Sequence, residues 1–406
     1  MWKNHLLPPT TFRLCLLAFL AGINVGIWYF LPYYILDLGG NAVDVGLIST
    51  IPSFVAAFIQ LSLGEILDDK LGNTKQLLEM GFLFTAIFAL PFLAVTNRYL
   101  VIVCAAVLET FNSITIIWGV ANSMYMVHLT SERRRARIMS VYSASWFLGN
   151  IMGSYVAGFL ALINWRFVFI VFIGVSLSAG GFLKYFLPGD TLNPPRYQQL
   201  IRNMFTMNQV IDALKQIPAV LCRSSKAFTS FTVGLSIRSI GISMVTPLIS
   251  IYLAVVLQAS KPLIATLTSI NSGARIVFSP FAGWMADLIG RKKVFLFGLG
   301  VMIMYPVLIV LTPDAHLLYP SYLLMGLGWS CNQATYLAWQ ITLLPSQQSR
   351  AMGILNFLNY LSWAIGPTLG GVLGENIGIF PSVITAVIIE IIGLSLLIRV
   401  PETLAS

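Results

Sequence analysis

The sequence is poor in charged residues. Only 10% of its 406 residues are Asp, Glu, Lys or Arg, whereas 57% are apolar. Soluble domains carry roughly 25% charged residues. A soluble chain with so little charge would expose apolar patches too large for it to stay monomeric in water. The composition therefore excludes an ordinary water-soluble fold and predicts that lipid is the main solvent of the chain.

Cysteines and catalytic motifs are also scarce. The four cysteines, Cys15, Cys104, Cys222 and Cys331, have no metal-ligand spacing, so neither a zinc site nor a disulfide framework is predicted. The sequence contains no nucleophile and base arrangement and no phosphate-binding glycine loop with a lysine. We therefore expect no enzyme activity, no metal and no cofactor.

Long apolar runs, by contrast, are abundant. A helix that spans the membrane needs about 20 apolar residues, and helices satisfy their own backbone in lipid. The sequence offers twelve such runs, which predict an all-α membrane protein of twelve transmembrane helices. They lie at about residues 12–37, 43–64, 74–95, 99–128, 138–162, 165–187, 227–257, 262–287, 293–312, 315–343, 350–374 and 378–399.

The positive charge follows the topology of these runs. The net charge is +9, but most of the 24 Lys and Arg residues fall in alternate connections between the runs. This bias marks those connections as cytoplasmic and predicts that both termini are cytoplasmic. We expect a multi-pass monomer in the plasma membrane, surrounded by the lipid bilayer, with no nucleic-acid partner.

A single long polar stretch divides the runs into six and six. It contains Pro194-Pro195, and its apolar spacing between residues 197 and 221 indicates an amphipathic helix. A similar tetrapeptide follows the second and eighth runs, as Asp69-Lys70-Leu71-Gly72 and Asp287-Leu288-Ile289-Gly290. This repetition predicts an N-terminal six-helix bundle over 1–187, a cytoplasmic linker over 188–226 and a C-terminal six-helix bundle over 227–406.

Three motifs resemble those of the major facilitator superfamily. Residues 283–292, GWMADLIGRK, resemble its G-x-x-x-D-[RK]-x-G-R-[RK] loop, with Leu288 replacing one basic residue. The first-half copy is weaker, since Glu65 occupies the glycine position. Residues 366–371, GPTLGG, resemble the family's G-P-x-x-G-G, and residues 165–167, WRF, resemble its W-R-[FWY] turn. The resemblance implies the major facilitator fold, with two pseudo-symmetric bundles that rock around a central site.

The resemblance also implies roles for individual residues. A carboxylate at a helix end can pair with arginine or with a helix N-terminus, so the loops are candidate gates, although Asp287 as a solvated loop charge is an alternative. Small residues let helices approach and slide. The gating candidates are Asp69, Lys70, Gly72, Gly283, Asp287, Gly290 and Arg291. The helix-interface candidates are Gly149, Gly153, Gly366, Pro367, Gly370 and Gly371.

Two arginines lie within the predicted spans. Arg238 is 12 residues after Lys226 and Arg275 is 12 before Asp287, so both sit about 18 Å from the cytoplasmic edge. By resemblance, their helices line and flank the central cavity. Two guanidinium groups suit an anionic substrate such as a carboxylate or a phosphate ester. The alternative is that one arginine pairs with an acid and is structural or gating.

Two acids also lie within predicted spans, where ionisable groups are functional candidates. Glu109 is the candidate for proton coupling, with a fixed pair to Arg238 as the alternative. Glu390 lies on the twelfth span, which the family places peripherally, so packing or snorkelling is favoured there. Polar and aromatic residues complete the predicted substrate site, and those singled out are Asn112, Trp118, Asn332, Gln333 and Tyr336, with Trp329 on a common face with Gln333.

These features predict a secondary active transporter that moves a small organic solute by alternating access. An anion is favoured as the solute, and protons are the expected coupling partner. The aromatic residues leave open a multidrug/proton antiporter that exports amphipathic compounds. A membrane sensor that binds its ligand without moving it is a further alternative, although the predicted tails are short for a signalling domain.

Overall fold

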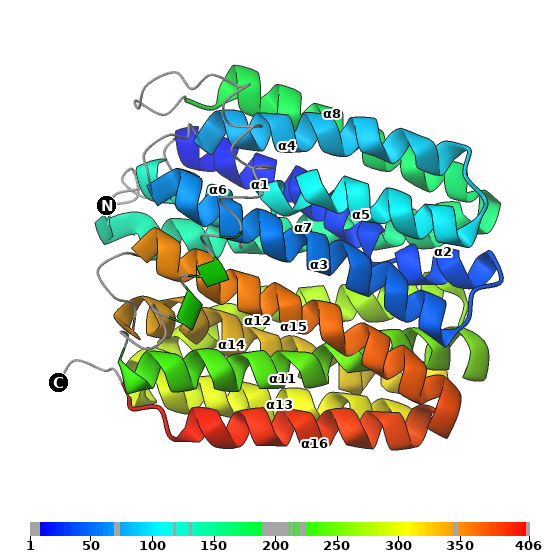
Figure 1. The fold of residues 1–406 in the computed structure, drawn as a ribbon. Coiled ribbons are helices and arrows are strands. Elements are labelled where there is room, and N and C mark those ends of the chain that lie inside the picture. The colour runs from blue at the N-terminus through cyan, green and yellow to red at the C-terminus, as the bar shows by residue number, and fades with distance from the viewer. Residues whose placement is uncertain are drawn as a thin grey trace.

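The computed structural model describes residues 9–68, 74–116, 119–129, 132–188, 225–343 and 348–402, with 211, 214, 215, 217 and 218. Within these residues the chain is helical and contains no strand (Figure 1). The first half contains α1 (Pro9–Trp28), α2 (Leu31–Asp37), α3 (Ala42–Asp68), α4 (Thr74–Ala89), α5 (Arg98–Thr115), α6 (Val120–Leu129), α7 (Glu132–Ile163) and α8 (Trp165–Phe186). The second half contains α11 (Lys226–Ile251), α12 (Lys261–Ile289), α13 (Arg291–Leu311), α14 (Tyr319–Leu343), α15 (Gln348–Ile377) and α16 (Ile379–Ile398).

These helices confirm the predicted all-α membrane protein. Nine helical stretches among the described residues are long and apolar enough to cross a membrane. The remaining long helices, α12, α14 and α15, follow the order of the predicted runs and are comparable in length. The start of α1 and the end of α16 lie at the same end of the bundle (Figure 1). This arrangement is consistent with twelve crossings.

Two predicted continuous helices are broken in the structure. The first run breaks between Trp28 and Leu31, where Pro32 occupies the start of α2. Proline has no N–H to continue the preceding helix, so it favours a new helix start. The fourth run breaks between α5 and α6, where Ile116 adopts an extended conformation and Gly119 follows. The apolar runs indicated the spans but not these interruptions.

The two halves repeat one packing arrangement. In the first, a Cβ atom at Gly153 of α7 would lie only 2.0 Å from the carbonyl oxygen of Ile23 in α1. In the second, a Cβ atom at Gly366 of α15 would lie 2.5 Å from the carbonyl oxygen of Ile240 in α11. Gly149 and Gly370 make comparably close contacts to the same partner helices. Glycine therefore allows backbone contact at corresponding places in both halves.

The halves meet along two helix pairs, α3 with α15 and α7 with α12; α3 and α15 run side by side in Figure 1. A Cβ atom at Gly46 would lie 2.6 Å from the carbonyl oxygen of Pro367, and one at Gly371 would lie 2.5 Å from that of Ala42. Leu214, in the predicted linker, packs beside the other end of this pair. Most of the predicted amphipathic helix lies outside the described residues, and the domain boundaries remain a prediction.

Candidate functional site

Arg238 is buried within the second half. Its side chain, on α11, is 3% exposed, and its guanidinium donates to the sulfur of Met302 on α13 at 3.0 Å. A thioether is a weak acceptor. The Nε atom has no hydrogen-bond partner among the described residues. Arg238 is therefore a buried cation with few polar contacts, which is costly unless an opposite charge compensates it.

Arg275 lies where the two halves meet. On α12, its Nε atom donates to the side-chain oxygen of Asn271 at 2.8 Å. Its guanidinium carbon lies 5.3 Å from the ring centroid of Phe147 on α7, in the first half. The hydroxyl groups of Tyr29 and Tyr305 are near enough to interact electrostatically with it. Arg275 is thus in contact with both halves, whereas the described contacts of Arg238 come from the second half alone.

A single indole joins the two arginines. The guanidinium carbon of Arg238 lies 5.6 Å from the ring of Trp329 on α14, and that of Arg275 lies 4.8 Å from the same ring. Both distances are within the range of cation–π attraction. The guanidinium carbons are thus separated by no more than the sum of these distances. Arg238, Trp329 and Arg275 together form what we call the arginine site.

Glu390 approaches the arginine site from α16. It is 0% exposed, and neither carboxylate oxygen has a hydrogen-bond partner among the described residues. Its charge interacts with that of Arg238. Of the two roles predicted for it, snorkelling is wrong, because a snorkelling side chain reaches the water and this one faces α11 inside the bundle. The packing alternative agrees with this position.

Glu109 stands apart from the arginine site. On α5 it is buried and accepts a hydrogen bond from Asn112 at 2.9 Å, and its charge acts on Tyr360 of α15. Among the described residues, the acid that interacts with Arg238 is Glu390. The alternative prediction, a fixed pair between Glu109 and Arg238, is therefore not supported. Glu109 is therefore placed near a helix of the opposite half.

The other predicted substrate residues are not all together. Asn332 is buried on α14, and its side-chain nitrogen has no hydrogen-bond partner among the described residues. Gln333 is half-buried one residue further along. Tyr336 stacks on Phe231 of α11 with ring centroids 6.1 Å apart. Trp118 lies outside the described residues.

The predicted gating residues are only partly described. Asp287 is exposed near the end of α12, which Gly290 terminates with a φ of 107°, a backbone conformation that favours glycine. Arg291 starts α13, and a Cβ atom at Gly283 would meet nothing within 4 Å. The first-half loop residues Asp69, Lys70 and Gly72 lie outside the described residues.

An ion pair joins the halves at the end of the bundle opposite the start of α1. Lys261, at the start of α12, lies 2.5 Å from Asp37, at the end of α2. The indole nitrogen of Trp165 donates to the same carboxylate at 2.7 Å, and the Lys261 nitrogen lies 5.4 Å from the Trp165 ring. Gly158 of α7 also closely approaches Lys261. These contacts bridge the two halves at this end.

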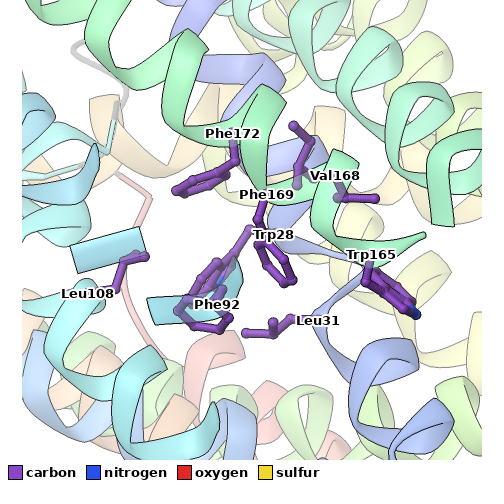
Figure 2. A pocket seen from close by; sticks show the side chains of 9 residues that line it. Trp28, Leu31, Phe92, Leu108, Trp165, Val168, Phe169 and Phe172 are labelled. Atoms are coloured by element: carbon purple, nitrogen blue, oxygen red, sulfur yellow. The ribbon is translucent and has the colours of Figure 1, made fainter. Parts of the chain in front are cut away.

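An apolar hollow lies beside that ion pair, within the first half. It is small, with a cavity volume of about 10 Å³, and Figure 2 shows its aromatic lining from α1, α8 and neighbouring segments. The residues around it are Ile27, Trp28, Leu31, Phe92, Leu108, Trp165, Val168, Phe169 and Phe172. Its lining carries no charged side chain, so it is chemically unlike the arginine site.

Sequence reasoning missed several residues of the arginine site. Phe147 and Met302 contact the two arginines, and Tyr29 and Tyr305 interact electrostatically with Arg275. Tyr29 lies at the break before Pro32, and this proline could have indicated an irregular segment from the sequence alone. The other three are ordinary residues in apolar helices, and their role depends on helix rotation, which spacing alone does not specify.

Known structures share this fold at low sequence identity. A POT family transporter in complex with 5-aminolevulinic acid gives a TM-score of 0.74 at 15% identity, covering 99% of this chain and 97% of that one. A bacterial homologue of the human lysosomal transporter Spinster, in an inward-facing and unoccupied conformation, gives 0.68 at 12%, covering 96% and 95%. The human organic anion transporter MFSD10 (TETRAN) gives 0.67 at 14%, covering 96% and 99%.

Curated relatives match over shorter segments. The methylenomycin A resistance protein of Streptomyces coelicolor is 28% identical over 130 residues, which is 31% of this chain and 27% of that protein. The MFS-type transporter ppzB of Metarhizium rileyi is 30% identical over 135 residues, 32% of this chain and 26% of that protein. The matches thus span about a quarter of the length of these relatives.

The family assignment rests on nearly the whole chain. The sequence profile of the Major Facilitator Superfamily matches residues 14–217 and 231–406, one segment in each half. The fold of the helices, the repeated glycine contacts and the solved structures agree with this match. The chain belongs to the Major Facilitator Superfamily of membrane transporters.

Proposed function

We propose that the protein is a secondary active transporter that moves a small organic anion by alternating access, coupled to protons. The observation that carries this proposal is that the guanidinium groups of Arg238 and Arg275 both lie within cation–π distance of the Trp329 ring. A guanidinium group offers a planar fork of donors that fits carboxylate and phosphate. Two such groups around one aromatic ring favour an anion with a flat apolar part.

The position of Arg275 supports its role as the first contact with the substrate. Its neighbours come from both halves, through Phe147 of α7 and Trp329 of α14. A site at such an interface changes its exposure when the halves rock, as alternating access requires. The fold shared with a human organic anion transporter is compatible with this assignment.

Glu109 is our candidate for the residue that couples proton movement to rocking. It is buried, it is held by Asn112, and its charge reaches Tyr360 in the opposite half. A carboxyl group at that position gains or loses a charge between two helices that must separate. We also propose that both termini are cytoplasmic and that Asp287, Gly290 and Arg291 are elements of the gate at this end.

Reconstituted protein can test the function directly. We expect proteoliposomes containing the full chain to accumulate radiolabelled benzoate or phenyl phosphate when a pH gradient is imposed, and to lose this uptake when the gradient is collapsed. Empty liposomes and protein carrying Arg275→Gln are the controls. Uptake that is equal in wild-type and Arg275→Gln vesicles would contradict the assignment of the arginine site.

Export of amphipathic compounds by a multidrug/proton antiporter is the second candidate. The apolar, aromatic hollow of Figure 2 favours it, as does the similarity of one segment to a methylenomycin A resistance protein. Transport of a lipophilic cation that is unaffected by Arg238→Gln and Arg275→Gln, together with no anion uptake, would favour this alternative.

A further inference from the structure

Glu390 is held in place by close packing of α16 on α11. A Cβ atom at Gly393 would lie 2.5 Å from the backbone nitrogen of Arg238, and one at Gly241 would lie 2.6 Å from Cγ of Glu390. The absence of side chains at the two glycines lets the helices touch. The contact positions the acid and the arginine in one interface away from water. Neither residue can escape to solvent without the helices moving apart.

The first half contains the corresponding contact without charge. Ser176 lies eleven residues after the start of α8, and Glu390 lies eleven residues after the start of α16. The glycine contacts at Ile23 and Ile240 are equivalent in the two halves, so the residues that follow them, Asn24 and Gly241, are equivalent too. Asn24 donates to the Ser176 hydroxyl at 2.7 Å. A neutral hydrogen bond therefore serves the packing of this interface in the first half. Packing alone does not explain an acid at the corresponding position in the second half.

The charge that acts on Glu390 has one source within the described part of the chain. Arg238 of α11 supplies it, whereas α13 and α15, also packed on α16, contribute no titratable group to Glu390. The carboxylate oxygens accept no hydrogen bond, and Nε of Arg238 donates none. An ionised carboxylate in such a place is stabilised by the nearby cation alone, so its protonation and the charge of Arg238 depend on each other.

We propose that Glu390 sets the charge of the arginine site by binding a proton. When Glu390 is ionised, its negative charge compensates Arg238. When it takes one proton from water, it becomes neutral and leaves the charge of Arg238 beside Trp329 uncompensated. An anion that binds between Arg238 and Arg275 then replaces the lost negative charge. Glu390 acts through Arg238 and is a positioning residue for charge, not a group that touches the substrate.

This inference rests on the proposed anion site and adds a stoichiometry to it. At the arginine site, one proton binds to Glu390 for each negative charge that binds between the arginines, and no other bond changes; a proton on Glu109 is counted separately. Because binding linkage is reciprocal, a proton on Glu390 strengthens anion binding and a bound anion strengthens proton binding. Over the pH range in which Glu390 is ionised, the affinity for the anion falls by up to about tenfold per pH unit.

An infrared titration tests the protonation step without any ligand. The carboxyl band of a neutral acid is distinct from that of its carboxylate. We expect the difference between wild-type and Glu390→Gln protein in lipid nanodiscs to contain a carboxyl band that disappears as the pH rises. In Arg238→Gln protein this band persists at every pH tested. A difference spectrum without a pH-dependent carboxyl band, or with one that Arg238→Gln leaves unchanged, would overturn the proposal.

Benzoate binding tests the link to the substrate. Wild-type affinity for benzoate should fall with rising pH, Glu390→Gln should bind it with a constant, high affinity, and Glu390→Asp should restore the pH dependence. Glu375→Gln, which removes an exposed acid of α15, is the matched control and should behave as wild type. If Glu390 had only a structural role, Glu390→Gln and Glu390→Asp would lose stability equally and keep the wild-type pH dependence of benzoate binding. That result would also overturn the proposal.

The two arms separate failure of this inference from failure of the proposed function. If wild-type protein binds and transports benzoate while Glu390→Gln keeps the wild-type pH profile, Glu390 has no part in setting the charge and the anion site stands. If wild-type protein shows the Arg238-dependent carboxyl band but transports neither benzoate nor phenyl phosphate, the protonation of Glu390 is supported and the anion assignment fails.

Discussion

The contact of α1 with α8 and that of α11 with α16 occupy equivalent places in the two halves but contain different chemistry. The first contains the hydrogen bond between Asn24 and Ser176. The second contains Arg238 and Glu390, both buried and neither hydrogen-bonded to the other. Equivalent backbones thus accept either a neutral pair or a charged one. This difference is what we expect if the charges of the second half serve binding, as proposed, and not folding.

Among the changes that compare the two halves, removal of Arg275 should have the largest effect on anion binding. Arg275→Gln should weaken anion binding by roughly 100-fold, because removal of the charged partner of a bound anion costs about 2–5 kcal/mol. Binding measured by isothermal titration in detergent would report it. Asn112→Ala, in the first half, should have a much smaller effect on anion affinity. Arg166→Gln removes an exposed arginine and serves as the control; equal losses in Arg275→Gln and Arg166→Gln would refute the asymmetry.

The glycine contacts should respond equally in the two halves. A Cβ atom at Gly153 or Gly366 would collide with the partner backbone, so each change to Ala should lower stability by about 1–3 kcal/mol. Gly174→Ala, in α8, meets nothing within 4 Å and should be neutral or stabilising. Thermal unfolding of purified protein would measure all three. If the Gly153→Ala variant were as stable as wild type while the Gly366→Ala variant was destabilised, the glycine contacts of the two halves would not be structurally equivalent.

The neutral hydrogen bond of the first half should contribute modestly. Ser176→Ala should cost about 1 kcal/mol of stability, because buried hydrogen bonds between membrane helices are weak on average. We expect no change in the pH dependence of benzoate binding in this variant. A pH profile altered as strongly as in Glu390→Gln would mean that the two contacts are functionally equivalent.

The Asp37–Lys261 pair should have the smallest energetic effect. Both side chains are partly exposed, so its loss should cost no more than about 1 kcal/mol. Because it bridges the halves, Asp37→Asn should nevertheless shift the population toward opening at this end. Distances between spin labels on α2 and α12 would detect the shift. Recovery of the wild-type distances by Asp37→Lys combined with Lys261→Asp would support a bridging role.

The sequence predicted the architecture well because lipid imposes simple rules on it. Long apolar runs located the helices, and motif spacing located the repeat. Counting residues from Lys226 and Asp287 also put Arg238 and Arg275 at one depth, and the structure brings both to Trp329. Helix rotation was not predictable. For that reason the contact of Glu390 with α11 was missed. The breaks near Pro32 and Gly119 were missed because apolar runs do not show where a helix is interrupted.

Counterflow of benzoate through proteoliposomes tests the central claim most directly, because it needs both binding and alternating access but no driving gradient. It should be measured in wild-type protein, in Arg238→Gln, in Arg275→Gln and in the double variant. Our account predicts robust counterflow in wild type, a severe loss in Arg275→Gln, a smaller loss in Arg238→Gln and non-additive effects in the double variant. Counterflow that survives unchanged in the double variant would contradict an anion site formed by these two arginines around Trp329.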